Sequence, residues 1–298
     1  MYNIFLIIDA YSILYRAYAV NLDLQNSKNQ NVGGLINFIN IFNNILKLIK
    51  PSHLIICFDT SKNTFRNDIY KHYKENRIYT ENEYIYTRYN DIKHILNLIN
   101  VKYDNVYFYE GDDICGSYNH ISKAMNNYIY SGDRDMLQLI NNNTNIIFPI
   151  TGSSNIKIYN KQQVLNEYNI SIKQYIDYKC LIGDKSDNIP GVKNCGELTA
   201  KKLLIKYGNI NNIYKNINDN NKKIKNWKSI KKNLIEYKPN YNLYKTLVTI
   251  KKDVKLKYTF KDCKLNINWK NAIDYFKSLE LNQIINRINK GDFYENEY

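Results

Sequence analysis

The sequence predicts an α/β fold with a mostly parallel central sheet flanked by helices, and two observations lead to that prediction. Segments with the apolar period of an amphipathic helix, Leu35–Ile49 and Asp91–Ile99, alternate with short apolar runs, as in strand–helix–strand crossovers. Four of these runs have the continuous apolar character of strands buried on both faces, and each leads into an acid: Ile4–Ile8 into Asp9, Leu54–Phe58 into Asp59, Val106–Tyr109 into Glu110, and Tyr128–Gly132 into Asp133.

The acids at the strand ends predict where a site lies. Ligands of open α/β sheets bind outside the carboxyl ends of the strands. A single acid at such a position is commonly the N-cap of the next helix. Four of them in one chain are hard to explain as caps, so we expect them to share a site.

The segment Thr64–Arg88 differs from its surroundings because it is polar, aromatic and basic and has no clear apolar stripe. A long excursion of this kind between core elements is usually a functional lid or a disordered insert. Arg and Lys alternate here with Tyr, which favours a partly helical lid that holds a nucleic-acid strand by charge and base stacking. A solvated loop is the alternative.

The stretch 182–196, I-G-D-K-S-D-N-I-P-G-V-K-N-C-G, is a junction in the charge pattern. Before Gly191 there are 19 Lys and Arg against 18 Asp and Glu, and from Gly191 onward there are 23 against 10, within a net charge of +14. This asymmetry favours a polyanionic partner, and nucleic acid ahead of a membrane surface, over a merely solvated lysine-rich surface.

The chain beyond the junction reads as mostly helical. A helix is expected after Gly196, and others over Ser229–Tyr237 and Asn271–Leu281. Asn209–Asn226 is expected to be a mobile loop, and Val248–Tyr258 to form a short strand or cross back over the first region. We expect a metal-binding α/β core over 1–182, including the excursion at about 64–90, and a helical region over 183–298.

The ligand types present limit the chemistry. The five cysteines are odd in number and widely spaced, and the four histidines form no zinc-binding pattern. A metal would therefore be held by oxygen, which favours Mg²⁺ or Mn²⁺. The apolar start is too short for a signal peptide or a membrane span, so a cytoplasmic location or an organellar lumen is expected.

Nine acids are the candidate metal ligands. Gathering them without cations would cost strong mutual repulsion, whereas two Mg²⁺ ions ~4 Å apart would relieve it and support an in-line phosphoryl displacement. The nine are Asp9, Asp59, Glu110, Asp112, Asp113, Asp133, Asp135, Asp184 and Asp187.

At this point the chain resembles the 5′-to-3′ exonuclease domain of bacterial DNA polymerase I, within the wider group of 5′-nucleases and flap endonucleases. The matching stretches occur in that family's order: I-I-D-A-Y-S-I-L-Y-R-A-Y at 7–18, F-D at 58–59, T-F-R at 64–66, H-Y-K-E-N-R at 72–77, E-G-D-D at 110–113, S-G-D-R-D-M-L-Q-L at 131–139 and I-G-D-K-S-D-N-I-P-G-V at 182–192.

The resemblance implies a division of roles. A first metal site would use Asp9, Asp59, Glu110 and Asp112, and a second would use Asp113, Asp133, Asp135, Asp184 and Asp187. A helical arch would bring Lys74 and Arg77 to the scissile phosphate and Tyr73 near the strand end. Arg16 and Arg66 match basic, DNA-binding positions of the family motifs.

G-V-K-N-C-G at 191–196 resembles the family's helix-hairpin-helix, in which backbone amides and a monovalent cation, K⁺, hold duplex phosphates. The resemblance implies DNA-binding roles for Gly191, Val192, Lys193, Gly196, Lys201 and Lys202. Three positions depart from the family pattern: Lys193 replaces a usual Pro, Cys195 a usual Val, and Leu198 a common Lys.

The resemblance implies a monomeric, metal-dependent 5′-to-3′ exonuclease and flap endonuclease that acts in primer removal, replication and repair. Its partner would be DNA with a 5′ flap, a nick or a junction, or an RNA primer on DNA. The alternatives are a non-catalytic protein that binds junction DNA and another Mg²⁺-dependent, acid-rich α/β phosphohydrolase.

Overall fold

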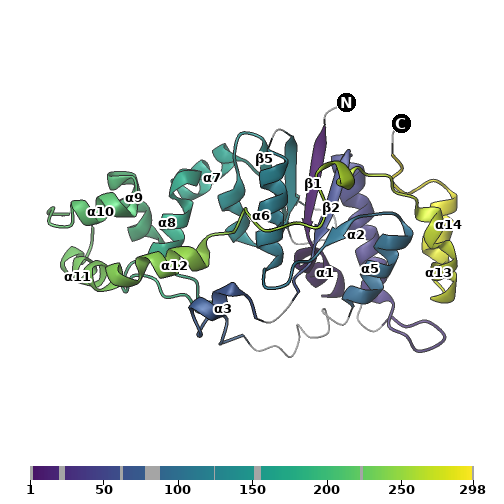
Figure 1. Ribbon diagram of the computed structural model, residues 1–298, viewed down its shortest axis with the longest axis horizontal. Coiled ribbons are helices and arrows are strands. Elements are labelled where there is room, and N and C mark those ends of the chain that lie inside the picture. The colour runs from purple at the N-terminus through teal and green to yellow at the C-terminus, as the bar shows by residue number, and fades with distance from the viewer. Residues whose placement is uncertain are drawn as a thin grey trace.

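A computed structural model of the chain describes residues 3–296, except 20–23, 61–62, 78–87, 124, 151–155 and 222–223. Its centre is a six-stranded sheet with the order β3-β2-β1-β4-β5-β6, in which the pairs are parallel except for the antiparallel β5–β6 pair (Figure 1). The strands are β1 Ile4–Asp9, β2 His53–Cys57, β3 Tyr103–Asp104, β4 Asn126–Tyr130, β5 Thr144–Pro149 and β6 Ile156–Tyr159. The predicted α/β fold class is confirmed.

Helices cover both faces of this sheet and extend beyond it. In chain order the α-helices are α1 Ala10–Tyr18, α2 Gly33–Ile49, α3 Phe65–Ile69, α5 Tyr89–Leu98, α6 Gly111–Ile121, α7 Lys161–Tyr168, α8 Ile172–Ile182, α9 Glu197–Tyr207, α10 Ile210–Lys215, α11 Trp227–Tyr237, α12 Tyr241–Val248, α13 Ile273–Ser278 and α14 Asn282–Asn289. Short 3₁₀ turns are η1 Arg134–Leu139, η2 Lys238–Asn240, η3 Lys261–Cys263 and η4 Trp269–Ala272.

The central strands are apolar on both sides because each side faces a separate core. Phe5 and Ile7 of β1 belong to one core with side chains of α6 and α8, and Leu6 and Ile8 belong to the other core with side chains of α1, α2 and α5. Alternate residues of a strand point to opposite faces, so a strand covered by helices on both faces must be apolar throughout.

One expected strand is wrong. Val106–Tyr109 is not a strand; β3 ends before it, and the segment forms a turn instead. Phe108 has a φ of 75°, which lies in the left-handed region, and the Tyr107 side chain is 77% exposed. The aromatic run looked like a buried strand, but its backbone bends at the sheet edge. Strands β5 and β6 were not among the expected elements.

Beyond the junction the chain forms a helical lobe, α9 to α12, at one end of the molecule (Figure 1). Within the expected mobile loop Asn209–Asn226, the structure contains α10, whose apolar residues Ile210 and Ile213 are fully buried. The loop prediction was wrong there because the asparagine-rich composition masked the two apolar positions that anchor this helix.

After α12 the chain crosses back over the sheet, as one of the two expected alternatives stated, and the other alternative, a strand, is not found there. The backbone amide of Lys251 donates to Asp113 at 2.8 Å, that of Val254 to Ser117 at 3.1 Å, and that of Lys257 to Asp104 at 3.0 Å. The crossing segment is therefore tied to α6 and β3 by side chains that accept its backbone hydrogen bonds.

The last helices, α13 and α14, lie at the opposite end from the helical lobe (Figure 1). Trp269, Phe276 and Ile284 are buried in the same core as Phe42 of α2. The expected region 183–298 is thus divided in space between a helical lobe and a segment that completes the sheet's core. None of the helices in the described ranges has the length and apolarity needed to cross a membrane.

Candidate active site

The strand-end acids lie together at the carboxyl edge of the sheet. Asp9 accepts hydrogen bonds from the Tyr11 amide at 3.0 Å and from the hydroxyls of Ser12 at 2.5 Å and Ser131 at 2.8 Å. Asp59 accepts the Gly111 amide at 2.6 Å, so the end of β2 is joined to the start of α6. These contacts hold the carboxylates of neighbouring strands over one small area.

The alternative of helix caps also holds for some of these acids. Asp9 caps α1, Glu110 takes part in the capping box of α6, and Asp133 caps η1 by accepting the Asp135 amide at 2.7 Å. Capping places a carboxylate at the positive end of a helix and restricts its side chain. The two interpretations are compatible, because a cap uses only part of a carboxylate's acceptor capacity.

The acids are close enough to raise one another's pKa values. Burial, followed by repulsion from Asp59 and Asp133, raises the pKa of Asp9 to about 6, although hydrogen bonds from serines oppose the shift. Burial and Asp133 raise the pKa of Asp135 to about 7. The pKa of Asp112 is raised well above its ordinary value by burial and then by surrounding acids: Asp133, Asp9, Glu110 and Asp59.

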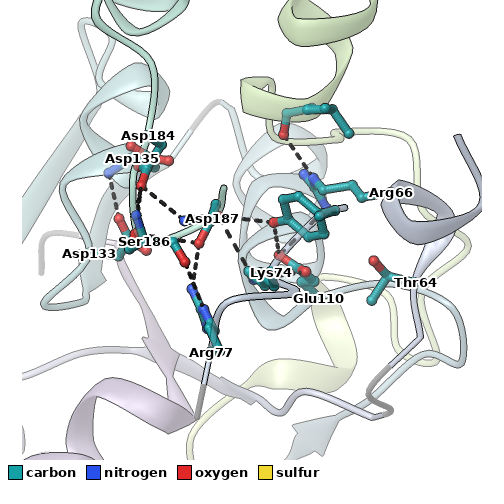
Figure 2. Close-up of polar contacts among 12 residues, drawn as sticks. Thr64, Arg66, Lys74, Arg77, Glu110, Asp133, Asp135, Asp184, Ser186 and Asp187 are labelled. Carbon is teal, nitrogen blue, oxygen red and sulfur yellow. Dashed lines mark hydrogen bonds and ion pairs between the residues drawn. The ribbon is translucent and has the colours of Figure 1, made fainter. Parts of the chain in front are cut away.

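Three basic side chains form ion pairs with acids of the cluster. Lys179 of α8 bridges Asp135 at 2.6 Å and Asp184 at 2.7 Å. Lys74 lies 2.9 Å from Glu110, and Arg77 bonds Asp187 at 2.5 Å (Figure 2). Burial alone would raise the pKa of Glu110, but Lys74 and Arg66 outweigh it and hold that pKa below its ordinary value.

Tyr73 links the two acids that face Lys74. Its hydroxyl lies 3.2 Å from Glu110 and 3.0 Å from Asp187, and its ring is buried. The three residues expected at the scissile phosphate, Tyr73, Lys74 and Arg77, therefore all contact the acid cluster. Tyr73 and Lys74 lie in a turn after α3, and Arg77 directly follows that turn. Residues 78–87 of the expected arch are outside the described residues.

The carboxylate set suits hard cations. In the described part of the chain no three acids, histidines or cysteines converge on one point as the side chains stand, and Lys179, Lys74 and Arg77 instead bridge or meet the acids. A divalent ion such as Mg²⁺ or Mn²⁺ prefers oxygen ligands, which carboxylates supply. Such an ion would also relieve the mutual repulsion among the buried carboxylates. The residues present fit such ions.

The junction loop is a turn closed by paired backbone hydrogen bonds. Asp184 and Ile189 exchange backbone hydrogen bonds at 2.8 Å each, and Asp184 Oδ1 accepts the amides of Ser186 at 2.8 Å and Asp187 at 3.2 Å. A Cβ on Gly191 would lie 2.3 Å from the backbone of Ile182, so the chain can pass itself here only with glycine.

The same loop holds the segment that follows α3. The Lys74 amide donates to the Asp187 carbonyl at 3.0 Å, the Asn76 side chain to the Lys185 carbonyl at 2.9 Å, and the Asn188 side chain to the His72 carbonyl at 2.8 Å. Lys74 itself has a φ of 55°, an uncommon left-handed conformation. The junction therefore determines where the cations of this segment lie.

Arg66 and Asp113 lie elsewhere than expected. The Arg66 guanidinium grips both oxygens of Asp113, at 2.6 and 2.8 Å, and also donates to the carbonyls of Leu247 and Thr249. Arg66 is 2% exposed and Asp113 is fully buried. Both side chains are engaged within the protein, Arg66 with Asp113 and two carbonyls, and Asp113 with Arg66 and the Lys251 amide. We therefore propose a structural role for each in place of the expected DNA contact and metal ligand.

The residues of the expected hairpin serve two purposes. Val192 and Cys195 are buried, and the Val192 amide donates to the Leu181 carbonyl at 2.9 Å, so Val192 anchors the turn rather than facing solvent. Lys193, Gly196 and Lys202 are exposed. Lys201 lies 3.6 Å from Glu197, and Arg16 donates to the Ile150 carbonyl at 2.5 Å.

Sequence reasoning missed Lys179, Ser12 and Ser131. Ser12 lies three residues after Asp9 and Ser131 two before Asp133, spacings that would have identified both as partners of strand-end acids. Lys179 had no such signal, because one of its partners, Asp135, is remote in the sequence and meets it only through the packing of α8 on η1.

Comparison with known proteins shows which family this chain belongs to. Residues 4–169 match the family model for the 5′-3′ exonuclease N-terminal resolvase-like domain, and residues 170–271 match the 5′-3′ exonuclease C-terminal SAM fold. The chain belongs to the 5′-3′ exonuclease family. A member of this family from Buchnera aphidicola subsp. Acyrthosiphon pisum, the 5′-3′ exonuclease, is 34% identical over 281 residues, which cover 93% of this chain and 96% of that protein.

Longer members are also similar. DNA polymerase I of Streptococcus pneumoniae is 34% identical over 252 residues, which cover 82% of this chain but only 28% of that protein. Among solved structures, the bacteriophage T5 D15 flap endonuclease in a complex with DNA and metal ions has a TM-score of 0.66 at 19% identity, covering 82% of this chain and 88% of that one. At that identity the likeness shows the shared fold.

Proposed function

We propose that the protein is a divalent-metal-dependent 5′-to-3′ exonuclease and flap endonuclease that hydrolyses phosphodiester bonds of DNA. The observation that carries the proposal is the meeting of buried acids at the carboxyl edge of the sheet with Lys74 and Arg77 from the adjoining segment. A phosphodiester needs metal-binding acids on one side and fixed cations on the other, because phosphoryl transfer depends mainly on positioning and charge stabilisation.

Two Mg²⁺ ions, or Mn²⁺ in their place, would be held by eight of the nine expected acids. We assign Asp9, Asp59, Glu110 and Asp112 to one ion and Asp133, Asp135, Asp184 and Asp187 to the other, some of them through water. Bound ions would supply positive charge at the phosphate and acidify the attacking water. Hydrogen bonds from Ser12 to Asp9, from the Gly111 amide to Asp59 and from the Asp135 amide to Asp133 keep these ligands in place before substrate arrives.

Lys74 and Arg77 are the groups that would contact the phosphate. Both side chains are partly exposed, at 19% and 36%, and both lie against acids whose charge a substrate phosphate could replace as partner. Tyr73 fixes the turn between them and the acid cluster through its hydroxyl. Strong electrostatic support raises the pKa of Lys74 well above its ordinary value despite burial, so the ammonium stays charged.

The duplex would lie across the junction and the helical lobe. Its phosphates would meet the backbone of 191–196, with K⁺ at the hairpin, together with Lys193, Lys201 and Lys202. We include Arg16 as a contact near the sheet edge. Flaps, nicks and junctions, and RNA primers on DNA, are the proposed substrates, in keeping with primer removal, replication and repair. The monomeric state and the cytoplasmic or organellar location stay predictions.

The test is cleavage of a 5′-labelled flap DNA with Mg²⁺ by the wild type and by a variant that combines Asp133→Ala with Asp135→Ala. We expect products from the wild type and at least ~10³-fold slower cleavage by the variant, since removal of metal ligands abolishes the charge stabilisation of the transition state. The matched control combines Asp253→Ala with Asp274→Ala, two exposed acids that are not among the nine candidate ligands, and should cleave like the wild type.

Three outcomes would reject the proposal. Undiminished cleavage by the Asp133/Asp135 variant would show that the acids are not catalytic. Tight, salt-sensitive flap binding in Ca²⁺ without cleavage by the wild type in Mg²⁺ or Mn²⁺ would support the non-catalytic DNA-binding alternative, and no flap binding at all would favour a small-molecule phosphohydrolase.

A further inference from the structure

Three aromatic residues, Tyr107, Phe108 and Tyr109, directly precede Glu110, and with Phe65 they form an aromatic row. Tyr107 is exposed and the other three are half-buried. The rings of Tyr107 and Phe108 are stacked, with centroids 6.3 Å apart and planes inclined by 24°, and Tyr109 is in contact with both Phe108 and Phe65, at 6.2 and 5.8 Å. The row thus runs from the start of α3 to a freely accessible ring at Tyr107.

Core packing does not account for the outer half of the row. Tyr107 is 77% exposed, the largest fraction among the large apolar side chains in the described part of the chain. Phe108 has a φ of 75°, where a bulky residue is a genuine outlier and where glycine is the usual choice. An aromatic residue kept in a strained conformation beside an acid cluster indicates that its ring has a use there.

The surrounding contacts make the row a rigid surface. Thr60 donates its hydroxyl to the Val106 carbonyl at 2.8 Å, and the Phe65 amide donates to the Phe108 carbonyl at 3.1 Å. These bonds join the turn to both ends of the connection that leads from β2 into α3. The backbone at Phe108 is therefore held in place before any ligand arrives.

The chemistry around the row favours a nucleic-acid strand. Lys251 lies over the Phe65 ring at 5.5 Å, and Lys74 contacts Glu110, the acid that directly follows the row. Aromatic rings beside cations are the pattern by which proteins hold unpaired bases, since every base has a face that can stack. Paired bases inside a duplex do not offer that face, so the row suits a single strand.

We propose that Tyr107 and Phe108 form a stacking platform for an unpaired base of the substrate, next to the candidate active site. This inference rests on the proposed nuclease function and adds a substrate-positioning surface to it. The platform would hold the single-stranded arm of a flap at the point where it leaves the duplex, and it would have no role on a nicked duplex that lacks such an arm.

The test compares equilibrium binding of a 5′-flap DNA and a nicked duplex in Ca²⁺. Two variants are used, Tyr107→Ala and Phe108→Gly. Glycine accepts the φ of Phe108 without strain, so the second variant should unfold at no lower temperature than the wild type. We expect about tenfold weaker flap binding for each variant, as for loss of one stacked base, and unchanged binding of the nicked duplex.

Leu48→Ala is the matched control, because it also truncates an exposed apolar side chain, 59% exposed, near the end of α2. A single abasic nucleotide moved along the flap arm then locates the stacked base. At one position the abasic site should weaken wild-type binding about tenfold and leave the Phe108→Gly variant unaffected, because the variant has already lost that contact.

The outcomes separate this inference from the function on which it rests. If the wild type cleaves the flap while both variants bind it like the wild type, or lose flap and nicked duplex equally, the platform is refuted and the nuclease proposal stands. If the wild type neither binds nor cleaves the flap, the nuclease proposal itself fails.

Discussion

Asp112 and Asp113 are neighbours in the first turn of α6, yet the protein treats their carboxylates in opposite ways. Asp113 receives two hydrogen bonds from Arg66 and one from the Lys251 amide, at 2.6 to 2.8 Å. Asp112 faces other acids, and each neighbour named with its raised pKa pushes that pKa further up. The Asp113 carboxylate is paired with hydrogen-bond donors, whereas the Asp112 carboxylate is repelled by neighbouring acids.

The difference indicates that Asp113 stabilises the fold, whereas Asp112 belongs to the candidate active site. Arg66 connects Asp113 of α6 to the carbonyls of Leu247 and Thr249, so one ion pair joins α3, α6 and the end of α12. Asp112 contributes no such link. A protein tolerates unfavourable charge where a ligand will later compensate it, and it satisfies charge where only the fold depends on it.

The largest effect is expected from Arg66→Ala, which tests whether the Arg66–Asp113 pair stabilises the fold. Removing one partner of a buried ion pair leaves the other charged and unpaired, so we expect a loss of ~3–5 kcal/mol in the free energy of unfolding, measured with urea. Lys277→Ala is the control, because Lys277 pairs with Asp274 on the surface, where the side chains are 62% and 95% exposed. A loss no greater than the control's would refute a structural role for the pair.

Addition of Mg²⁺ should stabilise the protein through the acid cluster, to which Asp112 belongs, and not through the Arg66–Asp113 pair. At a Mg²⁺ concentration of 100 times the dissociation constant, binding to the folded state alone would stabilise the protein by about 2.7 kcal/mol. The Asp133/Asp135 variant loses ligands of one of the two ions, so its gain should be smaller than that of the wild type. Arg66→Ala should keep the full gain while remaining less stable at every concentration. Thermal unfolding with Mg²⁺ and with EDTA measures both, and equal gains in the two variants would contradict the division of roles.

The smallest expected effect comes from neutralising one acid at a time. In EDTA, Asp112→Asn should stabilise the folded state by ~1 kcal/mol, since it removes a repelled charge, whereas the matched Asp113→Asn should destabilise it. Urea unfolding measures the two signs. Asp112→Asn should also slow flap cleavage, and a destabilising effect of that change would show that the cluster is not electrostatically strained.

Much of this arrangement was predictable from local patterns. The apolar runs that end in Asp9, Asp59 and Asp133 predicted parallel strands and a site at their carboxyl edge, and the structure confirms those strands. The strand predicted before Glu110 was wrong, because a run of four apolar residues is compatible with a strand and with an exposed turn. The apolar pattern alone cannot distinguish these two conformations when the backbone depends on contacts with Thr60 and Phe65.

The sequence by itself determined the fold class, the order of acids along the chain and the basic character of the region after Gly191, because these depend on residue type and spacing. Only the tertiary structure decided which acid meets which cation. Adjacent residues of a helix point about 100° apart, so Asp112 turns to the acid cluster and Asp113 to Arg66. No spacing rule separates them, since the partner of each lies on a different element.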